Sequence, residues 1–456
     1  MKYAFINAAV LDGSENMQPT KNTAVLVEDG VIKAIEPSAD SFGDVEMIDL
    51  EGRYLMPGLI NLHVHLPGSG MPSYTKKQNA KTVNFLMSNI VTRSVVYSLC
   101  YKFARTQLMS GVTTIRTVGG LGNIDSSIRN DINKGKRIGP RMLVSDMAVS
   151  VPEGHMAGLL AYEAKTEDDC VRYVRKIAEN KPDLIKIMIT GGVLDAKVKG
   201  EPGVLKMPPE LVRACCNEAH RLGYKVAAHI ESPAGLRAAL ENGVDTVEHG
   251  ADPDEDMIRL FKETGAVQVC TISPAIPGAY FPTEITHMSE MGKFNSNIVM
   301  EGMIACAKKA LANGITVGLG TDTACPFVTH YDMWRELVYF KKFVGVSNAF
   351  ALHTATQVNA KIAGIENETG SVEVGKSADF LITDTSPLDD LTALRTPYMV
   401  VMKGKTIKQP KVKKFDYVET ELDKLLYYKT NTPTKIRRGV WLSAPHENAD
   451  QAGVGG

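Results

Sequence analysis

Two histidines, His63 and His65, stand two residues apart inside the apolar run LINLHVHL. Side chains at positions i and i+2 of a β-strand point to the same face, so the two imidazoles are predicted to lie side by side. Neutral imidazole is a common ligand of divalent metals, and a metal would satisfy both rings directly in an apolar strand. The pair therefore predicts a metal site, and two hydrogen-bonded core histidines are the alternative.

Three further residues with ligand chemistry end other short apolar runs. His229 follows VAA, His249 lies in VEHG, and Asp322 ends ITVGLGTD. Taken singly, these residues also fit a core histidine, a residue next to a helix start and a turn aspartate. Taken together, histidine and carboxylate ligands suit zinc or a similar divalent ion.

Lys186 lies in the middle of the apolar run DLIKIMIT, between Ile185 and Ile187. An ammonium ion is costly to bury in such a strand. One explanation is that the side chain extends to the end of the strand and keeps its charge in water. The other is that the amine is neutral and reacts with CO₂ to form a carbamate. Its oxygens would then bridge two metals at the spacing of about 3.5–4 Å that is typical of two-metal hydrolytic sites.

These residues need a scaffold that brings the ends of distant strands together. The middle of the chain alternates apolar runs with amphipathic helical stretches, such as PPELVRACCNEAHRLG and SPAGLRAALENG, which have Pro at the start and Gly at the end. The eight candidate strands are LINLHVHL, GVTTIRTV, RMLVSDMAV, DLIKIMIT, KVAAHI, VDTVEHG, AVQVCTI and ITVGLGTD. Eight parallel βα units predict an α/β fold, a (β/α)8 TIM-like barrel with its site at the C-terminal strand ends. A doubly wound open sheet is the rival, but no GxGxxG motif opens any unit.

Both ends of the chain instead contain short strands and tight turns. TAVLVEDG ends in an Asp-Gly pair, and SVEVGKSADFLI and YMVVMKGKTI have a similar pattern near the other end. We therefore predict a small β-sandwich domain formed by both termini, residues 1–56 and 362–415. Residues 57–361 would form the barrel and residues 416–456 a C-terminal tail.

Composition narrows the classes of partner. Lys plus Arg number 51 against 52 for Asp plus Glu, which gives no electrostatic reason to expect nucleic acid or an acidic membrane. The seven cysteines do not predict a disulfide framework, because the number is odd and Cys215 and Cys216 are adjacent. The opening run MKYAFINAAVLDG is interpreted as a strand that ends at an Asp-Gly turn rather than as a signal peptide. We expect a cytoplasmic protein without nucleic acid or membrane partners.

The combined motifs resemble the amidohydrolase superfamily. HVH after the first strand, Lys on the fourth, His on the fifth and sixth and Asp on the eighth match its pattern. GVTTIRTVGG, KIMITGGV, GLGTDTACP and SVEVGKSADFLI further resemble the imidazolonepropionase-related branch, which includes prolidase-like enzymes and dipeptidases that release arginine or lysine. The likeness covers roughly residues 1–408. It implies the barrel, the terminal β-sandwich and a metal-activated hydroxide.

Carried over position by position, the resemblance implies two divalent metal ions, for which zinc is expected. The implied ligands of the more buried ion are His63, His65 and Asp322. The implied ligands of the second ion are His229 and His249, with carboxylated Lys186 as the bridge. Zn, Mn and Fe all accept such a ligand set.

The implied reaction is the hydrolysis of a C–N bond, an amide or peptide, in a small molecule or dipeptide. Asp322 would take the proton of the attacking water and deliver it to the leaving nitrogen. His155 and His330 match positions where the branch carries histidines close to the substrate, and His155 is expected to assist catalysis as well. A surface-loop histidine is the alternative for each, and a homo-oligomer remains open.

Three departures from the branch leave the substrate open. Relatives often have Asp where Thr117 stands, and Gly-Gly-His where this chain has Glu-Gly before His155. Relatives often have His-Ala-His-Gly on strand five, where this chain has HIES. The first histidine is kept, and Glu231 shares the inward face of His229. Glu231 either brings a carboxylate near the site or is a charged residue at its rim.

Three rival functions remain. A mononuclear deaminase on the same barrel typically uses a Glu three residues after the strand-five histidine, where this chain has Ser232. A lactonase would use the same hydroxide on an ester. A non-enzymatic scaffold is the remote alternative, because such relatives usually lose metal ligands and all six positions are filled here.

Overall fold

The structure, a computed structural model, describes residues 1–72 and 80–426. The chain divides into two compact units, residues 1–414 and 415–456. The second unit contains the helix α14 (Asp416–Leu426), and the rest of the expected tail, residues 427–456, lies outside the described residues. Everything below concerns the first unit.

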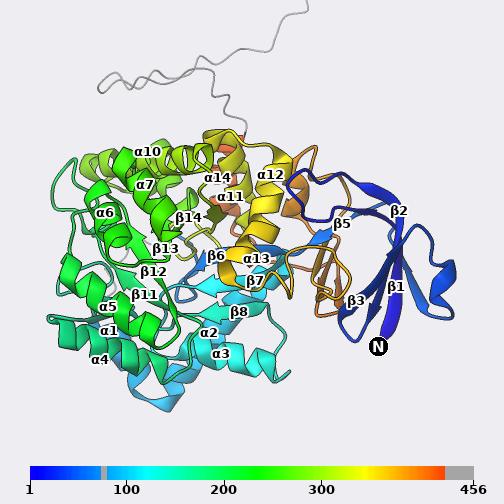
Figure 1. The fold of residues 1–456 in the computed structure, drawn as a ribbon, viewed down its shortest axis with the longest axis horizontal. Helices are drawn as coiled ribbons and strands as arrows, with labels where there is room; N and C mark the ends of the chain where they lie inside the picture. Colours follow the sequence, from blue (N-terminus) through cyan, green and yellow to red (C-terminus); the bar gives the residue numbers. More distant parts are fainter. Residues whose placement is uncertain (73–79, 427–456) are drawn as a thin grey trace, which may run out of the picture. The chain divides into compact units, whose positions relative to one another are not determined.

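Strands from both ends of the chain form one sheet, called here the terminal sheet (Figure 1). Its strands are β1 (Lys2–Val10), β2 (Thr20–Glu28), β3 (Val31–Glu36), β4 (Glu46–Asp49), β5 (Tyr54–Pro57), β16 (Phe380–Thr383), β17 (Met399–Met402) and β18 (Lys405–Lys408). Their order is β18-β17-β16-β5-β1-β2-β3, with β4 paired to β1. The Asp-Gly turn between β2 and β3 has both Asp29 and Gly30 at positive φ, as a two-residue hairpin loop requires.

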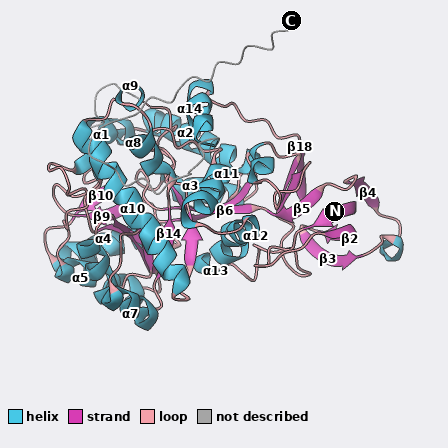
Figure 2. Ribbon diagram, turned by 90° about the horizontal axis from the view of Figure 1, so that it is seen from above, coloured by secondary structure: helices cyan, strands magenta, loops and turns pink. Residues whose placement is uncertain are grey.

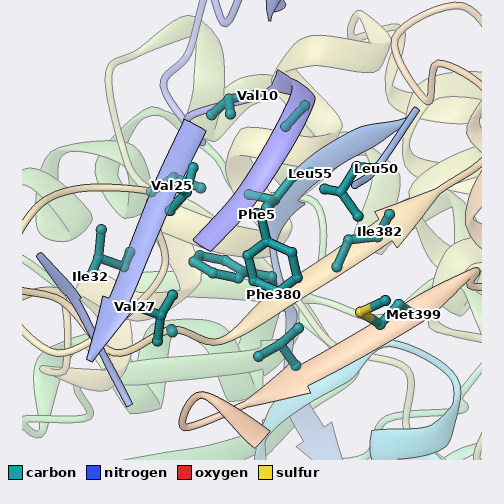
Figure 3. Packing of buried hydrophobic residues seen from close by; sticks show 14 of the residues in the cluster. Phe5, Val10, Val25, Val27, Ile32, Leu50, Leu55, Phe380, Ile382 and Met399 are labelled. Atoms are coloured by element: carbon teal, nitrogen blue, oxygen red, sulfur yellow. The ribbon is translucent and has the colours of Figure 1, made fainter. Parts of the chain in front are cut away.

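The core of the terminal sheet is apolar. Figure 3 shows its side chains pointing toward one another between strands from both ends of the chain. The rings of Phe5 and Phe380 meet edge to face with centroids 5.9 Å apart, a favoured aromatic geometry. Because β1 lies near the start of the chain and β16 near its end, this contact ties the two termini into one sheet.

The middle of the chain forms the barrel, in which every hydrogen-bonded pair of strands is parallel. Its eight strands are β6 (Leu59–Val64), β7 (Val112–Thr117), β8 (Arg141–Val144), β11 (Leu184–Met188), β12 (Lys225–Ile230), β13 (Thr246–His249), β14 (Val267–Cys270) and β15 (Val317–Leu319). After β8, the short strands β9 (Ala148–Ser150) and β10 (Ala161–Glu163) extend the sheet beside β11. The eight runs predicted from the sequence are all strands.

Two seams close the barrel. The amide of Asp183 donates to the carbonyl of Val144 between β8 and β11, and the amides of Thr321 and Asp322 donate to the carbonyl of His63 between β15 and β6. At the second seam a Cβ on Gly320 would stand 2.4 Å from the Cβ of His63, so only glycine fits. The predicted (β/α)8 TIM-like barrel with a small β domain formed by both termini is confirmed. The strands that were predicted as a β-sandwich belong to one hydrogen-bonded eight-stranded sheet, and the exact domain boundaries stay predictions.

Helices surround the barrel strands (Figure 2). They are α1 (Ala80–Ser88), α2 (Ile90–Met109), α3 (Ile124–Asn133), α4 (Glu167–Ala178), α5 (Pro209–Arg221), α6 (Pro233–Glu241), α7 (Glu255–Thr264), α8 (Ile276–Tyr280), α9 (Thr283–Thr286), α10 (Glu290–Ala312), α11 (Met333–Tyr339), α12 (Asn348–His353) and α13 (Asn359–Ala363). In the described part of the chain, no helix has both the length and the apolar character needed to cross a bilayer. All seven cysteines are free thiols.

Candidate metal centre

Strand β6 presents His63 and His65 at the C-terminal end of the barrel. The Nδ1–H of His63 donates to Glu248 Oε2 at 2.8 Å, and the Nδ1–H of His65 donates to the carbonyl of Gly119 at 2.8 Å. The Nε2 atoms lie 3.5 and 3.3 Å from Asp322 Oδ1. Because an acceptor holds each Nδ1, both rings are fixed with Nε2 free to bind a metal.

His249 and His229 complete the group of imidazoles. The His249 ring lies 4.7 Å from both the His63 and the His229 ring, centroid to centroid. Ligand atoms of His63, His249 and Asp322 all lie within 4.8 Å of one another. His249 Nδ1 is 2.7 Å from Thr271 Oγ1, whereas His229 Nε2–H donates to the carbonyl of Gly191 at 3.3 Å. The structure therefore brings the predicted histidines and Asp322 together, with His229 turned toward the loop after β11.

Two members of this group have a backbone conformation that ordinary residues rarely adopt. His249 has φ 66° and Asp322 has φ 55°, in the left-handed region that costs non-glycine residues about 1–3 kcal/mol. At His249 this breaks the alternation of the strand, so that the consecutive residues Glu248 and His249 both contact His63. Strain of this kind gathers at functional sites.

Sequence reasoning missed a buried charge network beneath the histidines. Arg116 Nη2 donates to Glu248 Oε1 at 2.6 Å, and its Nε donates to the carbonyl of Leu62 at 2.7 Å. Thr246 Oγ1 also donates to Glu248 Oε1, at 2.7 Å. Through its other oxygen Glu248 holds His63, so the network fixes the orientation of a predicted ligand. Like Lys186, Arg116 is a charged residue in the middle of an apolar strand, and this pattern could have identified it from the sequence.

The electrostatics of the group suit metal ligation. Burial, reinforced by the charge of Lys186, lowers the pKa of His63 to about 4. Burial also lowers the pKa values of His229 and His249 well below the ordinary value. Burial opposes ionisation of Asp322, but His63 and His65 outweigh it and hold its pKa well below the usual range. The rings are thus neutral and the carboxylate ionised, the forms that bind a metal.

Lys186 is 1% exposed, and its Nζ has no hydrogen-bond partner within the described ranges. Burial lowers its pKa to about 8. A buried amine that is unpaired and readily deprotonated can react with CO₂, and the carbamate oxygens would replace the missing partners. Together with the histidines and Asp322, Lys186 therefore fits a two-metal centre.

His155 stands beside His229 at the mouth of the site. The two rings stack with centroids 4.1 Å apart and an interplanar angle of 3°. The Nδ1–H of His155 donates to Asp195 Oδ2 at 2.5 Å, which leaves Nε2 available. Asp195 also accepts from the amide of Gly192 at 3.1 Å. No sequence pattern links Asp195 to His155, because the two residues lie in separate connections, one between β9 and β10 and the other between β11 and β12.

Glu231 and Cys325 lie in the same mouth. Glu231 Oε2 accepts from the amide of Val193 at 3.1 Å, and burial, followed by the charge of Asp322, raises the pKa of Glu231 to about 8. Cys325 Sγ–H donates to Asp322 Oδ2 at 3.4 Å. Glu231 is thus beside the candidate site, whereas Ser232, the next residue, caps α6 by accepting from the amide of Gly235.

His330 is set differently from His155. It is 2% exposed, its Nε2–H donates to the carbonyl of Gly68 at 2.6 Å, and its ring stacks on Phe103 with centroids 4.5 Å apart. Its Nδ1 has no hydrogen-bond partner in the described structure. The surface-loop alternative is therefore wrong for His330, and Nδ1 is the atom that it could offer to a ligand.

Known proteins have a similar fold. A protein from Bifidobacterium longum, provisionally assigned as a prolidase, has a crystal structure that matches with a TM-score of 0.82 and 35% identity, over 94% of this chain and 99% of that chain. A Xaa-Pro dipeptidase with bound methionine in its active site matches with a TM-score of 0.78 and 26% identity, over 90% and 100%.

Sequence comparison gives a consistent result. Ochratoxinase from Aspergillus niger is 24% identical over 437 residues, 86% of this chain and 84% of the relative. Imidazolonepropionase from Geobacillus thermodenitrificans is 25% identical over 397 residues, 82% of this chain and 86% of the relative. The amidohydrolase family matches residues 54–407. With this match and the barrel that carries it, the chain belongs to the amidohydrolase family.

Proposed function

We propose that this chain hydrolyses an amide or peptide bond of a small molecule or dipeptide, at a two-metal centre bridged by carboxylated Lys186. Family membership already makes it a hydrolase that acts on C–N bonds. One observation carries the metal centre. Neutral histidines and an ionised aspartate converge next to a buried amine that has no hydrogen-bond partner among the described residues.

The residues divide into two ligand sets. The proposed ligands of the first ion are His63, His65 and Asp322, and those of the second are His229 and His249, with Lys186 as the bridge. Two divalent ions held in this way would lower the pKa of water toward neutrality and so supply hydroxide. We propose zinc because histidine and carboxylate are its usual ligands, and we propose a cytoplasmic location.

Three side chains would handle the substrate and its protons. Asp322 would accept the proton of the attacking water and pass it to the leaving nitrogen. His155 Nε2 would face the carbonyl oxygen of the substrate, because Asp195 holds the other ring nitrogen. His330 would contact the substrate through Nδ1.

The relatives support a small substrate, since their names cover a dipeptidase, an ochratoxinase and an imidazolonepropionase. The rival mononuclear deaminase has less support, because Ser232 occupies the place of its glutamate and is engaged in capping α6. Ester hydrolysis by the same hydroxide stays a second outcome of the test below.

The test combines metal analysis with labelling. The purified chain should contain about two divalent ions, lose amidase activity on chelation and regain it with zinc and bicarbonate. With ¹³C-bicarbonate, a carbamate resonance should appear in the wild type and in a Lys225→Met control, whose lysine is exposed at the start of β12, and be absent in Lys186→Met. Full activity after chelation, or no metal uptake with zinc and bicarbonate supplied, would refute the proposal.

A further inference from the structure

Glu231 is a half-buried acid that the proposed mechanism does not use. It follows the proposed ligand His229 by two positions, where relatives in the branch often have a histidine. One carboxylate oxygen, Oε2, accepts from the amide of Val193, and no lysine or arginine among the described residues forms an ion pair with Glu231. A bound cation would favour the ionised form of this acid, which burial otherwise opposes.

The position of Glu231 can be fixed from its neighbours. A Cβ on Gly192 would stand 3.4 Å from Glu231 Oε2 and 3.2 Å from the ring of His155, so the two side chains flank the same glycine. The charge of Asp322 acts on the Glu231 carboxyl, and the charge of Glu231 acts on Cys325, whose thiol donates to Asp322 Oδ2 at 3.4 Å. Glu231 therefore lies near both His155 and Asp322, the residues proposed to contact the scissile carbonyl and the water.

Two lysines near the loop after β11 act on other acids. Lys197 pairs with Glu153 at 3.1 Å, and the charge of Lys206 acts on Asp195 and Glu153. Asp195, the other acid of this loop, already accepts from His155 and Gly192. Glu231 is thus the carboxylate in the mouth that retains capacity to accept a hydrogen bond.

We propose that Glu231 binds the protonated α-amine of the substrate, so that this chain prefers dipeptides with a free amino terminus over the same dipeptides with an acylated amino terminus. The inference rests on the proposed function. The α-amine is one carbon away from the scissile carbonyl of a dipeptide, and Glu231 lies beside the groups that would hold that carbonyl. Glu231 would therefore reach the α-amine itself, and the substrate would not need a cation at the end of a long side chain.

The experiment uses the zinc-loaded full chain and a matched pair of substrates, alanylproline and N-acetylalanylproline. We expect Glu231→Gln to lower kcat/KM for alanylproline about tenfold or more, the worth of a charge-assisted hydrogen bond. The same variant should change kcat/KM for N-acetylalanylproline less than about twofold. Glu241→Gln, which removes an exposed acid at the end of α6, is the control and should leave both values unchanged.

Three outcomes would overturn the inference. They are an equal loss on both substrates, no loss on either, and a fall in bound zinc in Glu231→Gln, which would make Glu231 a metal ligand. If the zinc-loaded wild type hydrolyses neither compound, peptide hydrolysis itself fails. Calorimetry on the chelated chain then tests Glu231 separately. Tighter binding of alanylproline than of its N-acetyl derivative, lost in Glu231→Gln, supports the inference, and equal or undetectable binding of both contradicts it.

Discussion

The terminal sheet and the barrel differ in the charged side chains that they bury. The sheet packs Phe5, Phe380 and other apolar residues against one another (Figure 3), and the buried carboxylate next to β16, Asp379, is paired with Arg141 at 2.6 Å. The barrel encloses Arg116, Lys186 and Glu248, each nearly inaccessible to solvent. Apolar burial stabilises a fold by roughly 25 cal/mol per Å², whereas each buried charge must be compensated by partners.

This contrast indicates that the two regions do different work. The sheet joins the chain ends and holds β5 and β16 against the barrel, and it gains stability from every buried ring. The barrel interior accepts costly charges and the strained backbone of His249 and Asp322, because together they present free ligand atoms at one place. The four predictions below test whether stability and chemistry are separated in this way, from the largest effect to the smallest.

The largest effect is expected from Asp322→Asn. The variant should lose about 10³-fold or more in kcat, because a proposed ligand and proton acceptor is removed at once. The melting temperature of the metal-free chain should fall, because the fold holds the pKa of Asp322 well below its usual range and its ionised form therefore contributes to stability. Steady-state kinetics and thermal unfolding measure the two effects, with Asp256→Asn, an exposed acid on α7, as the control. A near-normal kcat in Asp322→Asn would show that Asp322 is not part of the catalytic site.

Phe380→Ala should lower the stability of the fold and leave the chemistry of the site unchanged. Truncating a fully buried aromatic residue costs about 3–5 kcal/mol of unfolding free energy. Chemical denaturation should detect this loss, whereas metal content and kcat per folded molecule should stay at the wild-type values below the unfolding transition. A parallel fall in kcat would mean that the terminal sheet also shapes the catalytic site, and the separation would fail.

The sequence predicted the scaffold because its signals are local. Alternation places His63 and His65 on one face, and Pro and Gly bound the helices α5 and α6. The charged residue Lys186 in an apolar strand was also predicted to belong to the site, and the structure buries its amine without a hydrogen-bond partner among the described residues. Each of these inferences needs only neighbours within a few residues, and parallel strands then bring the ends together.

The remaining residues of the site depend on contacts between distant segments. Glu248 would face away from the centre by simple alternation, and only the left-handed backbone at His249 brings both residues to His63. The Asp195–His155 pair joins two loops that are 40 residues apart. Arg116 could have been found, because it carries the same signal as Lys186.

Glu248→Gln should weaken both metal binding and the stability of the fold. Loss of the charge that orients His63 should weaken metal binding by about 10- to 100-fold, the usual effect of removing the partner of a metal-binding histidine. Stability should also fall, because Arg116 would be left without its buried counter-charge. Metal titration and denaturant unfolding measure the two effects. Glu263→Gln, an exposed acid on α7, is the control, and unchanged metal affinity in Glu248→Gln would refute the role of the network.

The smallest expected effect is on the pH dependence of the unfolding free energy, which should differ between the barrel domain and the terminal sheet. Burial, followed by the charge of Asp146, raises the pKa of Asp125 on α3 to about 7. Between about pH 4 and pH 7 the folded chain therefore keeps a proton that the unfolded chain has lost, so this group makes the unfolding free energy fall as pH rises. Asp125→Asn should remove a slope of about 1 kcal/mol per pH unit, measured by urea unfolding at pH 5, 6 and 7, whereas Phe380→Ala should lower stability equally at all three. If Asp125→Asn and wild type have the same slope, Asp125 does not hold this proton in the folded chain. The contrast between the barrel domain and the terminal sheet would then rest on the residues of the candidate metal centre alone.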